Sequence, residues 1–205
     1  MAVRMLDIAR RFNMLSERIR RESVELGIPA IDPEDGLILS SAAFYVGGGT
    51  GSYVDAGAGI GYSTIWIAYG AYHRCTDITC KIVAIEYDVE LASILSRNLR
   101  EVEAMFRGRI EFEVVSGDAL DYFSRLEEKG REVFDMAFVD IEKGDYPEAL
   151  ERLENLLTAG GVAAFYNAFQ PPPPPLFFDM VSKRPWKPVV LPTPAGLLLA
   201  VKTAG

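Results

Sequence analysis

A glycine-rich turn between an apolar segment and a helix-forming segment limits the possible folds of this chain more than any other feature. Residues 53–63 read Tyr-Val-Asp-Ala-Gly-Ala-Gly-Ile-Gly-Tyr-Ser, with Gly57, Gly59 and Gly61 at alternate positions. Glycine permits the backbone angles of a sharp turn and lets a ligand approach where a Cβ atom would collide. The start of the following helix presents N–H groups without helical partners. The stretch therefore predicts a nucleotide-cofactor loop, with an ordinary strand-to-helix connection as the alternative.

The spacing of these glycines separates two classes of cofactor. Dinucleotide-binding loops follow the pattern G-x-G-x-x-G, whereas here Gly61 is followed by Tyr62 and the pattern is G-x-G-x-G. The shorter form is more typical of S-adenosylmethionine (SAM) sites, in which no pyrophosphate has to be bound. A nicotinamide-dependent dehydrogenase is therefore the least favoured hypothesis.

Two further strand ends extend the predicted cofactor site. Residues 81–86 form an apolar run ending in Glu86, whose carboxylate can accept hydrogen bonds from both ribose hydroxyls of an adenosine-containing cofactor. Residues 114–119 form another strand that runs into a polar turn, which we expect beside the adenine. A solvated acid at Glu86 and a plain helix cap at Asp118 are the alternatives. The predicted cofactor-binding residues are Asp55, Gly57, Gly59, Gly61, Tyr62, Ser63, Glu86, Tyr87, Asp118, Ala119 and Asp140.

Strands and helices alternate along the chain from Ser52 onward. The predicted strands are 52–57, 81–86, 110–115, 133–139 and 161–166, and the predicted helices between them are 62–72, 88–106, 118–129 and 145–158. This alternation predicts a single-domain, Rossmann-like α/β fold with a doubly wound, mostly parallel sheet. Helices at 3–26 and 33–45 precede it, and strands at 187–192 and 196–202 close it as a C-terminal antiparallel hairpin.

One domain is expected over residues 1–205. Its predicted parts are N-terminal helices within 1–45, a cofactor-binding core at 52–168 and a C-terminal hairpin region at 176–205. The length is enough for one well-packed core, and two full domains are not expected.

The charge balance narrows the class of partner. The formal net charge is −8 and the isoelectric point is near 4.8. Nucleic acid is not an expected partner, because phosphate binding needs concentrated Lys and Arg, and a small-molecule substrate is favoured. No apolar run approaches the length of a membrane span, and the first residues lack the apolar core of a signal peptide. We therefore expect a cytoplasmic protein without membrane attachment.

The first predicted helix carries an apolar stripe. Met5, Ile8, Phe12, Leu15 and Ile19 recur at three- and four-residue spacing, which places them on one helical face. The chain is also 49% apolar, more than one small domain needs to bury. We therefore expect a homodimer, because exposed apolar patches usually mark interfaces.

Residue usage also bears on the source and on the cysteines. The chain has one Gln and four Asn, and Arg outnumbers Lys 15 to 6, which indicates a thermophilic source. Cys75 and Cys80 are expected as free thiols, but a disulfide between them stays open as the alternative, because hyperthermophiles form intracellular disulfides.

The prolines at 171–175 predict a stiff surface connection, with docking to an aromatic-grooved partner as the alternative.

The segment after the fourth predicted strand carries the chemistry. It contains Asp140, Lys143 and Tyr146 in the pattern D-x-x-K-x-x-Y. Together with the glycine turn, the strand-end glutamate and residues 116–119, this pattern resembles the catechol and caffeoyl-coenzyme-A type O-methyltransferases, which use SAM. The resemblance covers about residues 28–168.

The resemblance implies methyl transfer from SAM to a hydroxyl group of a small acceptor, such as an aromatic one. It implies Asp140 as a ligand of a divalent cation, Mg²⁺ or Mn²⁺, and Lys143 as the base. The family's other two ligands are an Asp-Asn pair, where this chain has Tyr166 and Asn167. A phenol is a poor substitute for a carboxylate around a hard cation. We therefore expect weak or no metal binding by the free protein, with Asp140 and Asn167 as its only oxygen ligands.

Two alternative functions use the same residues. One is a metal-independent methyltransferase for another acceptor class, with Tyr166 or Lys143 positioning the acceptor. The other is a non-catalytic SAM-binding protein. The plain alternatives for single residues are a helix-capping role for Asp140 and a solvated position for Lys143. His73, the only histidine, is expected in a loop away from every strand end and receives no catalytic role.

Overall fold

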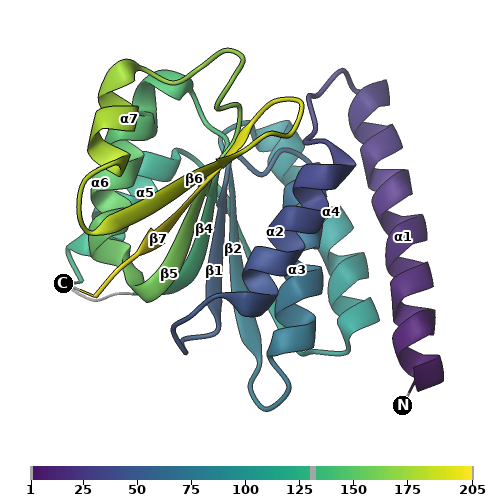
Figure 1. The fold of residues 1–205 in the computed structure, drawn as a ribbon. Helices are drawn as coiled ribbons and strands as arrows, with labels where there is room; N and C mark the ends of the chain where they lie inside the picture. Colours follow the sequence, from purple (N-terminus) through teal and green to yellow (C-terminus); the bar gives the residue numbers. More distant parts are fainter. Residues whose placement is uncertain (1, 130–132, 205) are drawn as a thin grey trace.

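The computed structural model describes residues 2–129 and 133–204, which form a sheet covered by helices on both faces (Figure 1). The strands are β1 (Ser52–Ala56), β2 (Cys80–Glu86), β3 (Ile110–Ser116), β4 (Phe134–Val139), β5 (Leu157–Phe165), β6 (Trp186–Leu191) and β7 (Leu197–Lys202). Their order is β3-β2-β1-β4-β5-β7-β6. The first five are parallel, while β7 is antiparallel to both β5 and β6. The predicted doubly wound, mostly parallel sheet with a C-terminal antiparallel hairpin is confirmed.

The helices divide into two layers (Figure 1). One face of the sheet carries α1 (Ala2–Glu25), α2 (Pro33–Tyr45), α3 (Tyr62–Arg74) and α4 (Val89–Phe106), and the other carries α5 (Ala119–Glu127), α6 (Tyr146–Leu156) and α7 (Pro175–Val181). A short 3₁₀ helix, Lys143–Asp145, follows β4. The order of strands reverses between β1 and β4, and at such a switch point the carboxyl ends of parallel strands leave room for a ligand.

Several helix starts are fixed by capping side chains. Asp88 accepts hydrogen bonds from the backbone N–H groups of Glu90 and Leu91, at 2.8 and 3.0 Å. Asp118 accepts one from Asp121 at 3.0 Å, so its predicted capping role is present. Asp32 occupies the cap position of α2, but its side chain makes no capping bond. The start of α2 therefore depends on proline at the first helical position, where its missing N–H costs nothing.

Two boundaries differ from the sequence prediction. Strand β5 begins at Leu157, four residues earlier than expected, and includes Gly160 and Gly161. Gly160 has a φ of +80°, and the β4–β5 register is irregular here, so the glycines mark a distortion inside the strand. Helix α7 was not predicted, because the proline run suggested only extended chain. Pro175 is the first residue of that helix, a position that proline tolerates.

Most of the apolar stripe of α1 packs against the rest of the same chain. Ile8, Leu15 and Ile19 are buried, and Phe12 packs edge-on against Trp66 of α3 with ring centroids 4.9 Å apart. The stripe therefore gives no support to a homodimer.

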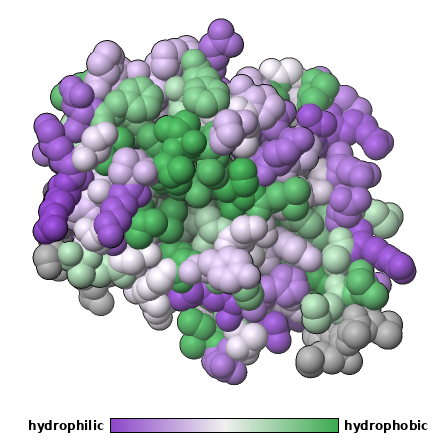
Figure 2. All heavy atoms as spheres, viewed as in Figure 1, coloured by the Kyte–Doolittle hydropathy of each residue, from purple (hydrophilic) through white to green (hydrophobic). Residues whose placement is uncertain are grey.

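A different apolar surface is exposed, which we call the α2–β6 face. It consists of Leu37 and Tyr45 on α2 and of Val189 on β6, which pairs with Leu199 of β7, and Figure 2 shows apolar side chains gathered over β6 and beside α2. Tyr45 is 82% exposed and Leu37 is 58% exposed. A hollow of about 360 Å³ lies between α2 and Leu199 of β7.

The expectation of free thiols at the two cysteines is wrong, and the bridge that was left open as the alternative is present. Cys75 and Cys80 form a disulfide, with Cα atoms 6.0 Å apart, that joins the end of α3 to the first residue of β2. Both cysteines are buried. No described helix combines the length and the apolar character needed to cross a membrane.

Candidate active site

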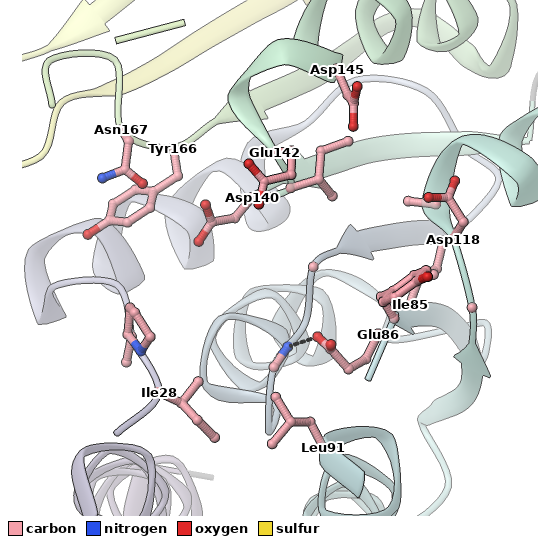
Figure 3. Close-up of a pocket in the computed structure, with 18 of the residues that line it drawn as sticks. Ile28, Ile85, Glu86, Leu91, Asp118, Asp140, Glu142, Asp145, Tyr166 and Asn167 are labelled. Carbon is pink, nitrogen blue, oxygen red and sulfur yellow. Dashed lines mark hydrogen bonds between the residues drawn. The ribbon is translucent and has the colours of Figure 1, made fainter. Parts of the chain in front are cut away.

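A cavity of about 900 Å³ opens at the carboxyl ends of the parallel strands (Figure 3). Its walls come from the turns after all five parallel strands, from the segment between α1 and α2, and from the start of the proline run. The lining residues are Ile28, Pro29, Ala30, Gly57, Gly59, Ile85, Glu86, Tyr87, Leu91, Gly117, Asp118, Ala119, Asp140, Ile141, Glu142, Asp145, Tyr166, Asn167 and Pro171. The volume is in the range of pockets that enclose small organic ligands.

The glycine turn brings β1 close to the end of β4. A Cβ atom on Gly57, whose φ is +87°, would lie 2.1 Å from the carbonyl oxygen of Asp140, so a larger residue cannot replace it. The N–H groups of Gly57 and Ala58 both donate to the carbonyl oxygen of Ile85 at 3.0 Å. Gly61 occupies the cap position before α3, with a φ of +102°, and does not line the cavity. Its contribution is therefore to the turn itself.

Glu86 stands at the floor of the cavity (Figure 3). One carboxylate oxygen accepts a hydrogen bond from the N–H of Gly59 at 2.7 Å, and the other accepts one from Asp88 at 2.9 Å. Each oxygen keeps a further lone pair, so the carboxylate can still accept hydrogen bonds from a pair of ligand hydroxyls. The neighbouring Tyr87, Asp118 and Ala119 also line the cavity.

Asp55 does not line the cavity but lies fully buried beneath the glycine turn. Its Oδ2 atom accepts hydrogen bonds from the hydroxyls of Ser63 and Thr64, at 2.7 and 2.5 Å. Burial raises the pKa of Asp55 to about 7, and the two hydroxyl donors act in the opposite direction. This geometry makes Asp55 a residue that positions the start of α3. Tyr62 and Ser63 line a small hollow beside the main cavity.

Asp140, Lys143 and Tyr146 form a connected group at the end of β4. Lys143 Nζ donates to Asp140 Oδ1 at 2.9 Å and to the hydroxyl of Tyr146 at 2.7 Å. Burial raises the pKa of the Asp140 carboxyl, while the charge and hydrogen bond of Lys143 oppose that rise. The hydroxyl of Tyr146 also lies 3.1 and 3.0 Å from the carbonyl oxygens of Val139 and Tyr166. Tyr146, to which the sequence assigned no role of its own, therefore ties Lys143 to the ends of β4 and β5.

The cavity is strongly acidic. Five carboxylates line it, belonging to Glu86, Asp118, Asp140, Glu142 and Asp145. No Lys or Arg is among the lining residues of the described chain. Glu142, Asp145, Pro171 and residues 28–30 were not predicted as site residues, because only the fold brings them to this edge. His73, expected in a loop, is in the last turn of α3 and does not line the cavity.

Comparison with known proteins identifies the group to which these features belong. A family model described as O-methyltransferase matches residues 49–170, more than half of the chain. A catechol O-methyltransferase from Niastella koreensis is 30% identical over 126 residues, covering 60% of this chain and 52% of that protein. A putative O-methyltransferase from Mycobacterium ulcerans is 28% identical over 149 residues, covering 73% of this chain and 61% of that protein. The matched regions thus span little more than half the length of these relatives.

Solved structures share the fold over nearly the whole chain. An O-methyltransferase from Bacillus cereus in complex with S-adenosylhomocysteine (SAH) superposes with a TM-score of 0.74 at 22% identity, covering 93% of this chain and 91% of that one. An O-methyltransferase from Streptomyces achromogenes in complex with SAM has a TM-score of 0.73 at 23% identity, covering 93% and 90%. The chain belongs to the O-methyltransferase family.

The cofactor end of the cavity has the features that a SAM-using member of this family needs. The glycine turn lets a ligand approach its backbone, and the Glu86 carboxylate has free lone pairs. The residues present therefore fit SAM.

The other cofactor that the family resemblance implies, a divalent cation, does not fit the residues present. Of the three predicted ligand positions, Asp140 is already paired with Lys143, and Tyr166 carries a neutral phenol. Asn167 has a single amide oxygen to offer, and its amide nitrogen donates to the carbonyl oxygen of Gln170 at 3.0 Å. Within residues 2–129 and 133–204, no group of three or more His, Cys, Asp or Glu side chains is placed to hold a metal ion.

Proposed function

We propose that this protein transfers the methyl group of SAM to a hydroxyl group of a small acceptor. The observation that carries the proposal is the meeting of three features at one cavity: the glycine turn, the Glu86 carboxylate and the Asp140 carboxylate, which pairs with Lys143 just outside the lining residues. Membership of the O-methyltransferase family supports the same reaction class.

Residues at the two ends of the cavity would have different tasks. Glu86 would accept the ribose hydroxyls, Asp118 and Ala119 would contact the adenine, and the turn from Gly57 to Ser63 would hold the amino-acid part. SAM supplies a methyl group on a positively charged sulfur, and when the acceptor oxygen bonds to that carbon, the electron pair of the broken C–S bond stays on sulfur. Lys143 in its amine form would take the hydroxyl proton. Asp140, 2.9 Å from Nζ, would stabilise the ammonium group that results.

The acidic lining restricts the charge of the acceptor. The five carboxylates and the absence of a lining Lys or Arg in the described chain make an anionic acceptor unfavourable, because like charges repel strongly where water is limited. We therefore infer an uncharged or cationic acceptor. The ring of Tyr166 gives this end an apolar surface that suits an aromatic compound.

Calorimetry tests the cofactor and separates the alternatives. We expect SAM and SAH to bind and NAD not to bind; binding of NAD in preference to SAM would reject the proposal. A transfer assay with radiolabelled SAM and a panel of uncharged, cationic and anionic phenols then tests turnover. Binding of SAM without turnover of any hydroxylated compound would favour the non-catalytic SAM-binding alternative.

We also propose that the protein is a homodimer that pairs through the α2–β6 face. Its exposed apolar side chains flank the hollow beside Leu199, so a second copy can bury both surfaces at once. Light scattering of Tyr45→Glu is expected to show a monomer, whereas Met14→Glu, at a site 71% exposed on α1, should leave the dimer intact. A monomeric wild-type protein at micromolar concentration would disprove this arrangement.

A cytoplasmic location, a thermophilic source and the absence of nucleic-acid partners remain predictions from the sequence. The buried Cys75–Cys80 disulfide supports the thermophilic source, since intracellular disulfides are common in hyperthermophiles.

A further inference from the structure

We propose that the acceptor is an aromatic compound bound through a single hydroxyl group, without a bridging divalent cation, and that Tyr166 determines this specificity. This inference rests on the proposed function, since it concerns the acceptor end of the same cavity. Three observations at that end support it, one from each residue that would otherwise hold the cation.

The position beside Asp140 Oδ1 is already occupied by Lys143. Its Nζ atom lies 2.9 Å from Asp140 Oδ1 and 2.7 Å from the hydroxyl of Tyr146. The Tyr146 hydroxyl is itself fixed between two backbone carbonyl oxygens, which holds Lys143 at this position. A divalent ion on Asp140 Oδ1 would have to displace this nitrogen.

Tyr166 stands beside Asp140 where the family's ligand pair would supply a second carboxylate. Its ring is largely buried, lies 6.3 Å from the ring of Phe138, and lines the cavity on the same side as Asp140 (Figure 3). A phenol ionises only near pH ~10 and is therefore a neutral, weak ligand for Mg²⁺. Its flat ring instead offers a surface against which an aromatic acceptor can pack.

The side chain of Asn167 stabilises the turn that follows β5. Its backbone is in the left-handed region, with a φ of +56°, and its side-chain nitrogen donates to the carbonyl oxygen of Gln170. The side chain thus holds the entry to the proline run. Its one remaining oxygen is not enough to hold a hard cation that prefers several oxygen ligands.

The consequence concerns which acceptors can react. A bridging cation increases the affinity for acceptors with two adjacent hydroxyl groups, because both oxygens can coordinate it. Without the cation, the second hydroxyl of a vicinal diol gains no such contact. A compound with one hydroxyl should therefore bind as well as the corresponding diol.

Metal titration gives a test that does not depend on turnover. Mn²⁺ is titrated calorimetrically into the free and the SAH-loaded protein, using wild type, Tyr166→Asp and the matched variant Tyr166→Phe. We expect no saturable binding to wild type or Tyr166→Phe, and an affinity at least about tenfold higher for Tyr166→Asp, which adds a charged oxygen ligand. Micromolar binding to wild type, or a Tyr166→Asp variant no better than Tyr166→Phe, would overturn the inference.

Acceptor binding gives the second test. Phenol and catechol are titrated into SAH-loaded wild-type protein by NMR, with Mg²⁺ or with EDTA. We expect both to bind with similar affinity and no dependence on Mg²⁺. Catechol binding that tightens with Mg²⁺, or failure of phenol to bind, would overturn the inference. Failure of SAH to bind in the calorimetry that tests the cofactor would instead count against the proposed function, so the two failures are distinguishable.

Discussion

The two ends of the cavity are built in different ways. At the cofactor end, backbone groups set the geometry: Gly57 approaches the end of β4 too closely for any Cβ atom, and Glu86 is held by two backbone N–H groups. At the acceptor end, side chains set it, through the Lys143 pair with Asp140 and the ring of Tyr166. The first end can hold the same ligand across a family, whereas single substitutions at the second end change the chemistry.

The largest expected effect is the loss of turnover when a side chain at the acceptor end is changed. Lys143→Met removes the proposed base and should lower turnover by about 10²- to 10⁴-fold, the usual contribution of a positioned acid or base. The affinity for SAM should stay unchanged, because Lys143 is not among the residues that line the cavity. Steady-state rates and calorimetry measure the two quantities, and Lys183→Met, at an exposed site, is the control. Equal turnover in both variants would remove Lys143 from the mechanism.

The next effect concerns the stability of the cofactor end. The pKa of Asp55 is raised to about 7 in the fold, so the folded chain holds more protons than the unfolded chain from about pH 4 to about pH 7. The free energy of unfolding therefore falls as the pH rises through this window. Asp55→Asn can still accept from Ser63 and Thr64, so above about pH 7 we expect it to be more stable, by up to about 4 kcal/mol.

Urea denaturation on either side of the window measures this difference. The variant and wild type should be closest near pH ~4, where the unfolded carboxyl also binds its proton, and furthest apart near pH ~8. A pH-independent difference between the two proteins would show that Asp55 does not titrate in the fold.

The smallest effect is on cofactor affinity. Glu86→Ala should weaken SAM binding by about 1.5–3 kcal/mol, the usual cost of losing hydrogen bonds to a charged group. Glu111→Ala changes an exposed acid on β3, outside the cavity, and should bind SAM as wild type does. Calorimetry compares the SAM affinities of the three proteins. An unchanged affinity in Glu86→Ala would show that Glu86 does not bind SAM.

The sequence predicted the cofactor end better than the acceptor end for a physical reason. A glycine pattern and a strand-end acid are local signals, and the alternation of strands and helices places both at one edge of the sheet. Tyr146 was visible only as part of a motif. Its hydroxyl contacts the carbonyl oxygen of Tyr166, twenty positions away in the sequence, and a local sequence pattern cannot predict such a contact.

Other differences between the predicted and the observed elements arise because glycine and proline each fit more than one kind of local structure. Glycine can end a helix or distort a strand, and Gly160 does the second because β5 continues through it beside β4. Proline can hold a chain extended or begin a helix, and Pro175 does the second. The stripe on α1 predicted an apolar contact correctly, but periodicity cannot say whether the partner surface is in the same chain, as it is for Phe12 and Trp66.

Ile28, Pro29 and Ala30, together with Pro171, form part of the cavity wall although they lie outside residues 49–170, which match the family. The limits of a family match record shared ancestry, and they need not coincide with the limits of an enclosed ligand site. A shortened chain cut at the matched residues would keep the glycine turn and Glu86 but leave the cavity without that wall. Deletion studies and domain grafts of this protein should therefore begin before α1 and end after β7.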